Sequence, residues 1–503
     1  MKAALHEVLV RQREYSRDAA SRAELGLIMP DAFVRGIRHI GYKSNVEAIA
    51  ELVDNSIQAY AQRIDLVLRY PEGQNTRKPS QVAVIDDGHG MSPDMLRVAM
   101  MWGGTHREND RAGLGRFGYG LPCATVSMGR RFTIYSKVKR RAVHAVSFDL
   151  DCLDSGTYGS GRAERAVHIA QPARLPRFVR EAIARDHPTG WHSGTVVVID
   201  KLDRLDWTTA SGLRRNLVRH FGVAYHKLLG ETAIHIDGEG VQPIDPLFLN
   251  LEAKFHSLDE DRANAIEPVR MTLALADGSA GEVVLRYAWL PPTFGATDKS
   301  RDAIGINANA RFPILKQYHG IVFSRNGRVV DVQTRTPWTT FINNDRYIRI
   351  EVEFSASLDE AFGVTTSKQQ VTVAPEMWDR LQAIGLSKAI EQLRAKVREA
   401  KAERQRTKYD GRVAPAIVGL DLHPDVGVSA PQVACRAPAH RATSLRAALV
   451  MSDPTVALTT LLARIERRII AGNPSVAGEY DRLLRGWTRE LTRICDGPTG
   501  GQA

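Results

Sequence analysis

Apolar positions follow two different patterns along this chain of 503 residues, and the pattern changes near residue 207. From residue 31 to 206, helical spacing alternates with short continuous apolar runs. Runs of this length, rich in β-branched and aromatic residues, are typical of buried strands. They occur at 82–86, 132–135 and 195–199. The first region is therefore expected to combine helices with a buried sheet.

The second region, residues 207–385, begins with a helical pattern at 210–229 and then becomes rich in strands. Four segments have strand composition, namely 233–236, 282–287, 320–323 and 347–354. Asn326-Gly327 stands between two apolar runs, which is a strong short-range signal for a β-hairpin. A chain of this length is expected to divide into two to four domains.

The two ends of the chain are more polar than these regions. Residues 1–30 are charged and helix-prone, and residues 386–412 form a helical pattern that becomes increasingly basic. Such a charge run usually marks a solvated helix face, although a helix that binds a polyanion has the same composition. A Pro- and Ala-rich stretch at 413–445 indicates a linker. Residues 446–503 contain two amphipathic helical patterns, which fit core packing or self-association.

Charge and composition narrow the class of protein. The net charge of +11 favours contact with polyanions such as DNA, although an arginine-rich proteome would give the same balance. There is neither an apolar run long enough to span a membrane nor a secretory signal. The four cysteines lie far apart without a C-x-x-C pair, which suits a reducing cytoplasm. We therefore expect a cytoplasmic protein with no membrane partner.

The first segment whose side chains could carry out chemistry is a helical pattern at 44–59. Ser44 and Glu47 have the spacing of a capping box that begins a helix. Glu51 and Asn55 are four residues apart, so they lie on one face about a turn apart. The amide can offer an oxygen to Mg²⁺, and the carboxylate can accept a proton from a water that attacks a γ-phosphate. Taken alone, the segment fits an ordinary solvated helix face equally well.

A second segment ends a buried strand with the pattern Asp86-x-Gly88-x-Gly90, followed by Met91. The two glycines let backbone approach a flat ligand closely. A carboxylate there can accept a hydrogen bond from an exocyclic amine, which selects adenine over a base with a carbonyl at that position. A strand followed by a plain turn explains the same residues.

A glycine-rich loop follows, with glycines at 113, 115, 118 and 120. Successive backbone amides in such a loop can form an anion-binding concavity. The first three glycines also match the dinucleotide-binding fingerprint, but that motif needs a strand directly before it and an acidic residue about 20 positions later. A polar stretch precedes it here and basic residues follow, so the fingerprint fails on context. The phosphate-binding pattern G-x-x-x-x-G-K-[ST] does not occur.

Together these segments resemble the motifs of the GHKL ATPases, the class of gyrase B, the ninety-kilodalton heat-shock chaperones, histidine kinases and MutL. The first motif, E-x-x-D-N-x-x-x-A, is matched by Glu51, Asp54, Asn55 and Ala59. The second, D-x-G-x-G, is matched by Asp86, Gly88 and Gly90, and the third, G-x-x-G-x-G, by Gly115, Gly118 and Gly120. A fourth, Gly-Thr before a late strand, is matched by Gly194-Thr195.

The resemblance implies an α+β Bergerat fold, in which helices cover one face of a mixed sheet and Mg-ATP lies between the helices and a lid. It implies that Glu51 is the general base, Asn55 the Mg²⁺ ligand and Asp86 the acceptor for the adenine amine, with Thr195 supporting adenine. The other residues expected at the nucleotide are Asp54, Ala59, Gly88, Gly90, Met91, Gly113, Leu114, Gly115, Arg116, Phe117, Gly118, Tyr119, Gly120 and Leu121.

The second region is similar to the ribosomal-S5-like transducer domain of MORC ATPases, in segments 320–328, 350–354 and 362–369. Residues 48–55 are also closer to MORC proteins than to gyrase. In relatives with this domain a loop lysine reaches the γ-phosphate, and Lys368 fits that position. The resemblance covers about residues 31–375 and implies an ATP-binding domain at 31–206 followed by a transducer at 207–385.

From this resemblance we expect a slow ATPase whose lid closes on ATP and whose heads then form a homodimer, acting on DNA. A heat-shock-type chaperone acting on protein clients and a non-catalytic nucleotide-dependent scaffold are the alternatives. A histidine kinase would need a phosphoacceptor histidine on a helix upstream of the pocket, and only a few tens of residues precede Glu51.

Overall fold

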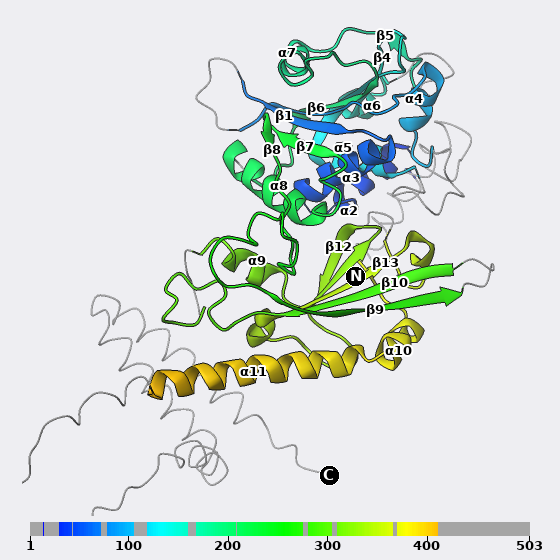
Figure 1. Cartoon of the computed structure of the whole chain (residues 1–503). Helices are drawn as coiled ribbons and strands as arrows, with labels where there is room; N and C mark the ends of the chain where they lie inside the picture. Colours follow the sequence, from blue (N-terminus) through cyan, green and yellow to red (C-terminus); the bar gives the residue numbers. More distant parts are fainter. Residues whose placement is uncertain are drawn as a thin grey trace, which may run out of the picture. The chain divides into compact units, whose positions relative to one another are not determined.

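Two β-sheets organise the part of the chain that the computed structural model describes (Figure 1). That part comprises residue 14 and residues 30–42, 44–71, 78–104, 118–158, 167–207, 209–274, 280–303, 309–365 and 370–410. All of it belongs to one compact unit, Met1–Pro415. The expected linker at 413–445 and the helical patterns of 446–503 lie outside the described residues, as does nearly all of 1–30.

The first sheet has eight strands in the order β5-β4-β3-β6-β2-β1-β7-β8. It is mixed, because β1 pairs in parallel with β7 while its other neighbouring strands are antiparallel. This confirms the expected mixed sheet. The strands are β1 (Arg63–Arg69), β2 (Gln81–Asp86), β3 (Gly129–Lys137), β4 (His144–Asp149), β5 (Gln171–Pro172), β6 (Gly194–Leu202), β7 (Ala233–Ile236) and β8 (Glu239–Gly240).

Helices cover one face of this sheet and enclose its main apolar core, and within the described ranges one helix lies on the other face (Figure 1). The core-side helices are α2 (Pro30–Ile40), α3 (Asn45–Gln58), α4 (Pro93–Ala99), α5 (Gly120–Met128), α6 (Leu150–Asp154) and α8 (Ala210–Ala224). On the opposite face, α7 (Arg177–Asp186) buries Val179 and Ala182 against Ile85 and Val198. The sequence predicted helices on one face only, so α7 is an addition to that arrangement.

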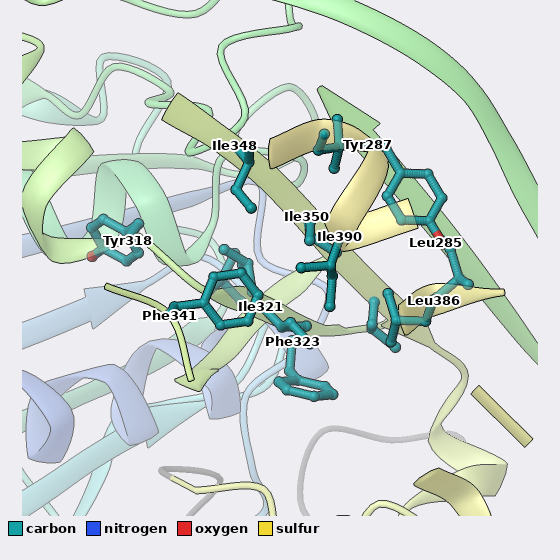
Figure 2. Packing of buried hydrophobic residues seen from close by; sticks show 14 of the residues in the cluster. Leu285, Tyr287, Tyr318, Ile321, Phe323, Phe341, Ile348, Ile350, Leu386 and Ile390 are labelled. Carbon is teal, nitrogen blue, oxygen red and sulfur yellow. The ribbon is translucent and has the colours of Figure 1, made fainter. Parts of the chain in front are cut away.

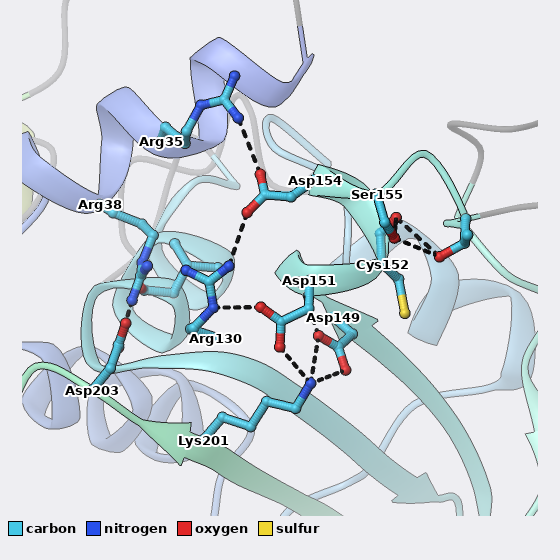
Figure 3. Close-up of polar contacts among 12 residues, drawn as sticks. Arg35, Arg38, Arg130, Asp149, Asp151, Cys152, Asp154, Ser155, Lys201 and Asp203 are labelled. Carbon is cyan, nitrogen blue, oxygen red and sulfur yellow. Dashed lines mark hydrogen bonds and ion pairs between the residues drawn. The ribbon is translucent and has the colours of Figure 1, made fainter.

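A network of ion pairs fixes α2 and α6 to the strands on which they pack (Figure 3). Arg130 of β3 and Lys201 of β6 each contact two aspartates, and Arg35 of α2 shares Asp154 with Arg130. The contacts join Arg130 to Asp151 and Asp154, Lys201 to Asp149 and Asp151, and Arg35 to Asp154. Because water reaches these partly exposed side chains and screens their attraction, each pair adds little to stability by itself.

The second sheet has five strands in the order β12-β11-β13-β10-β9. They are β9 (Asn264–Ala274), β10 (Ala280–Trp289), β11 (Ile321–Arg325), β12 (Arg328–Gln333) and β13 (Ile348–Phe354). The predicted hairpin at Asn326-Gly327 joins β11 to β12, and both turn residues have positive φ, 46° and 82°. Such a left-handed pair is the backbone of a type I′ turn, which explains the Asn-Gly sequence.

The second sheet packs on a core of its own, to which Val223 of α8 and three helices of the second region contribute (Figure 2). These helices are α9 (Phe312–Gln317), α10 (Pro375–Ala383) and α11 (Leu386–Asp410), and two short 3₁₀ turns, η2 (Asn343–Tyr347) and η3 (Ala356–Leu358), complete the region. Leu386 and Ile390 of α11 are fully buried against Ile350 and Phe323. The first part of the basic helix expected at 386–412 is therefore packed on the sheet and is not solvated all round.

One segment expected in the second region belongs to the first sheet. Helix α8 buries Leu213, Leu217 and Phe221 in the core of the first sheet, and β7 extends that sheet beside β1. The sequence placed a boundary at 206/207 because the apolar pattern changes there. The division of the chain into domains stays a prediction, but most buried apolar residues of 210–241 pack with the first sheet.

Candidate functional site

Helix α3 holds the first of the predicted site residues. Ser44 caps it by accepting a hydrogen bond from the backbone N–H of Glu47 (3.3 Å), as the capping box predicts. Glu51 is only 4% exposed and Asp54 is fully buried. A solvated helix face is therefore excluded for these two carboxylates. Asn55, one turn after Glu51, is half-buried.

The carboxylate of Glu51 lies against the beginning of α5. A Cβ atom at Gly120 would stand 1.9 Å from Glu51 Oε1, so only glycine allows this approach. The negative charge of Glu51 also acts on its neighbours. Burial and then Glu51 raise the pKa of Tyr42 well above its usual value, and the same two causes raise the pKa of Cys123 to about 11 although Trp102 opposes them.

Asp86, at the end of β2, is the second buried carboxylate. Its Oδ1 accepts hydrogen bonds from the backbone N–H groups of Gly88 (2.9 Å) and Thr195 (3.1 Å). Its Oδ2 accepts one from the hydroxyl of Ser56 on α3 (3.2 Å). Burial raises the pKa of Asp86 to about 6, while these three donors oppose the rise. Within the described part of the chain Ser56 is the donor to Oδ2, so one lone pair of this oxygen remains available.

Glycines bring backbone close to this carboxylate. Gly194 has a φ of +132°, and a Cβ there would lie 2.0 Å from the Asp86 carbonyl oxygen. The indole N–H of Trp191 donates to the same oxygen (2.7 Å). A Cβ at Gly88 would lie 2.6 Å from the Ala59 oxygen, which places the end of α3 beside the turn after β2. The D-x-G-x-G turn after β2 and the Gly194-Thr195 start of β6 therefore meet at Asp86.

Gly90 and Met91 continue this turn toward β3. Gly90 has a φ of +70°, and a Cβ there would lie 2.0 Å from the Lys137 carbonyl oxygen. The hydroxyl of Ser136 accepts the Met91 N–H (2.8 Å) and lies 3.0 Å from the Thr195 hydroxyl. The Thr195 hydroxyl is thus held beside the turn.

Sequence reasoning missed Ser56, Ser136 and Trp191. Ser56 follows directly after Asn55 and could have been included with that motif. Ser136 and Trp191 lie in no motif, and only the pairing of β3 with β6 reveals what they contact.

The described end of the glycine-rich loop packs on residues 103–104. Gly118 has a φ of +68°, and its carbonyl oxygen accepts the N–H of Gly103 (3.1 Å). Tyr119 is exposed, whereas Leu121 is half-buried. The other predicted phosphate-binding residues, Gly113, Leu114, Gly115, Arg116 and Phe117, lie outside the described residues, and so does Lys368.

Asp54 has partners that the sequence did not reveal. Its Oδ1 lies 2.8 Å from Nε of Arg328 at the start of β12 and 2.9 Å from the Tyr225 hydroxyl. Burial alone would lower the pKa of Arg328, but Asp54 and Tyr225 raise it above its usual value. The contact of Asp54 with nucleotide stays a prediction. In the structure its carboxylate joins α3 to the second sheet.

The donor set fits magnesium when phosphate supplies the other ligands. Among the described residues, no cluster of three or more His, Cys, Asp or Glu side chains could hold a metal by itself. Mg²⁺ commonly takes one or two protein oxygens together with waters and phosphate oxygens. The half-buried amide of Asn55, one turn from Glu51, can supply such an oxygen.

Comparison with known proteins identifies the class. The sequence profile described as "Histidine kinase-, DNA gyrase B-, and HSP90-like ATPase" matches residues 42–166. This stretch contains α3, β2 and α5, the elements that carry Glu51, Asp86 and Gly120. Residues 42–166 thus match the profile of the GHKL ATPases, as their motifs predicted.

Within that class the chain is similar to MORC ATPases. The ATPase MORC2 of Homo sapiens is 33% identical over 91 residues, which are 18% of this chain and 9% of that protein. The ATPase MORC2A of Mus musculus gives the same values. Protein MICRORCHIDIA 6 of Arabidopsis thaliana is 31% identical over 91 residues, 18% of this chain and 13% of that protein. The match thus spans about a tenth of the length of these relatives.

A GHKL domain implies ATP binding by the matched residues. The profile ends at residue 166, so the transducer identity of the second region stays a prediction. None of the described helices is long and apolar enough to cross a membrane.

Proposed function

We propose that this protein is a Mg-dependent ATP hydrolase in which α3 aligns both ends of the nucleotide. One observation carries the proposal: Ser56, on the helix that bears Glu51 and Asn55, donates to Asp86 Oδ2 at 3.2 Å. The carboxylate proposed for adenine and the one proposed for the water are therefore held by the same helix. Ser56, which holds Asp86, and Glu51 lie at different points along α3, and this separation suits a ligand with a base at one end and phosphates at the other.

Adenine recognition is assigned to Asp86. Its Oδ2 accepts the exocyclic amine of adenine, while its two backbone donors hold the carboxylate in position. A base with a carbonyl at that position would set two acceptors against each other, which costs about 1–3 kcal/mol. The Thr195 hydroxyl and the side chain of Met91 complete the base site.

Hydrolysis is assigned to Glu51. A water attacks the γ-phosphorus, its proton passes to the Glu51 carboxylate, and the bond from phosphorus to the β–γ bridging oxygen breaks to release ADP. Asn55 would hold Mg²⁺, which neutralises charge on the phosphate oxygens. Lys368 is proposed to approach the γ-phosphate from the second region.

We extend the proposal to a conformational cycle. The glycine-rich loop closes over bound ATP, the heads form a homodimer, and hydrolysis releases it. The net charge of +11 supports DNA as the macromolecular partner. Turnover is expected to be slow, because lid closure and head separation commonly limit such enzymes.

The test of the active site is Glu51→Gln, which keeps the volume of the buried side chain. Turnover should fall by about 10²–10⁴-fold, the usual contribution of a general base, while ATP affinity stays within a few-fold. The matched control is Glu231→Gln, at an exposed glutamate outside the site. Hydrolysis at the native rate by Glu51→Gln would reject this assignment.

The partner is tested with the wild-type protein. Light scattering with a non-hydrolysable ATP analogue should show a dimer, and short duplex DNA should stimulate hydrolysis less as salt rises. Stimulation by an unfolded peptide and not by DNA would favour a chaperone. ATP binding without any turnover would favour a scaffold.

A further inference from the structure

A concave basic site lies on α8, away from the candidate nucleotide site. Its volume is about 410 Å³, within the range of small-molecule sites. The residues that line it come from α8, β8, the segment after β8 and the beginning of α9. They are Ser211, Arg214, Arg215, Val218, Arg219, Glu239, Ile244, Lys254, Phe255, Ala310, Pro313 and Ile314.

Helix α8 presents two distinct faces. Leu213, Leu217 and Phe221 recur at helical spacing and are fully buried in the core of the first sheet. Arg215 and Arg219 lie about half a turn around the helix from that stripe and line the pocket. No lining residue of the pocket is among the residues predicted for the nucleotide. The pocket is therefore a separate site, and the inference drawn from it does not rest on the proposed ATPase function.

The charge of the pocket is unbalanced. Four of its lining residues are cationic and only Glu239 is acidic. Glu239 forms an ion pair with Arg214, and Arg219 donates to the amide oxygen of Asn216 (2.9 Å). Arg215 and Lys254 are exposed beside this group. A concave surface lined by one sign of charge focuses its field and attracts a counter-ion.

The floor of the pocket is apolar. Val218, Ile244, Phe255 and Ile314 line it, and Ile244 and Ile314 are buried in the core of the second sheet. Apolar walls strengthen the attraction between the cations and an anion, because the local dielectric constant is lower than that of water. A bare surface charge cluster would not provide such walls.

We propose that this pocket binds a phosphate group, with the part of the ligand next to the phosphate resting on the apolar floor. Arginine matches the geometry of phosphate oxygens with its forked donors, and lysine adds a point charge. The phosphate belongs either to a small phosphorylated molecule or to a nucleic acid strand. Because the lining residues come from both α8 and α9, the ligand contacts elements that pack on each of the two sheets.

The experiment measures the affinity of the full chain for pyrophosphate by isothermal titration calorimetry. The pocket variant is Arg215→Gln with Lys254→Gln. The control variant is Lys388→Gln with Arg398→Gln, which removes the same charge at exposed positions of α11. Since the candidate nucleotide site is identical in all three proteins, a difference reports the pocket alone, whether or not the chain hydrolyses ATP.

The pocket variant should lose about tenfold or more in pyrophosphate affinity, the size of one charge-assisted hydrogen bond, and the control should not. A short duplex DNA that competes with pyrophosphate, and that also binds the pocket variant more weakly, would assign the phosphate to nucleic acid. If the pocket variant loses affinity for pyrophosphate but binds DNA as the wild type does, the phosphate belongs to a small molecule. Equal affinity in all three proteins, or an equal loss in the control, would overturn the proposal. Circular dichroism of each variant verifies that it is folded.

Discussion

Each sheet buries a carboxylate on a strand, but the two carboxylates have opposite surroundings. Glu351 of β13 accepts from Lys227 (2.6 Å), Arg286 (2.9 Å) and the hydroxyl of Ser324 (2.6 Å). Burial alone would raise the pKa of Glu351, but these partners lower it below its usual value. Asp86 has only neutral donors in the described part of the chain, and its pKa rises to about 6.

The difference supports separate roles for the two carboxylates. Two cations neutralise Glu351, so its charge is fully used within the protein. Among the described residues, no cation pairs with Asp86 and one lone pair of its Oδ2 is unoccupied. Titratable groups perturbed in this way are concentrated at functional sites. We therefore interpret Glu351 as structural and Asp86 as a ligand-binding group, and the variants below test this distinction.

The largest expected effect concerns the contact between the two regions. Arg328→Met removes the cation beside Asp54, which is 0% exposed, and should destabilise the protein by about 3–5 kcal/mol. The measurement is the free energy of unfolding in urea. Adding Asp54→Asn to the same protein should recover much of the loss, because both charges are then gone. A single variant as stable as the wild type would contradict the contact.

Glu351→Gln should have the next largest effect, on stability alone. Replacing the ionised partner of Lys227 and Arg286 should lower the free energy of unfolding by about 2 kcal/mol. ATP affinity, measured by calorimetry, should stay unchanged. A marked loss of ATP affinity at constant stability would show that the structural interpretation of Glu351 is wrong.

Asp86→Asn should give the reverse result. The amide oxygen of Asn can still accept from the N–H groups of Gly88 and Thr195, and a buried charge is removed, so stability at pH 7.5 should be unchanged or slightly higher. ATP affinity should fall about ten- to a hundredfold, since the amine of adenine loses its ionised acceptor. The idea fails if the affinity is retained.

The smallest expected effect is a pH dependence of ATP binding. Because the pKa of Asp86 is about 6, the ionised acceptor is lost as the pH falls through that value, and affinity should drop about tenfold between pH 7.5 and pH 5. The effect of Asp86 protonation on the stability of the fold has the opposite direction. The folded state holds this proton more tightly than the unfolded chain, with its usual pKa of 3.8, so Asp86 favours folding increasingly as the pH falls from about 6 to about 4. Asp86→Asn should abolish both trends.

The sequence predicted local elements well. The cap at Ser44, the strand before Asp86 and the turn at Asn326-Gly327 depend on residues that are neighbours in the chain, and each is present in the structure. Strand β9 was missed because it contains Pro268 and is mostly exposed. It is an edge strand, where the missing N–H of proline is tolerated.

Long-range contacts could not be predicted from the sequence. Asp54 and Arg328 are 274 positions apart, and nothing in the composition of either segment indicates that they pair. The same holds for Asp86, whose partner Thr195 belongs to a strand formed 109 positions later. The resemblance to the GHKL class supplied the role expected of Asp86, and the structure supplied the reason that its carboxylate keeps an acceptor for a ligand.

The parallel pairing of β7 with β1 limits how this protein can be divided. A fragment that ends at residue 206 would lack α8 and β7, so β1 would keep β2 but lose its other neighbour, and the apolar surface beneath α8 would meet water. An uncovered strand edge of this kind promotes aggregation. Expression of the first sheet and its helices by themselves should therefore need residues up to Val241, which is the last side chain buried in that core.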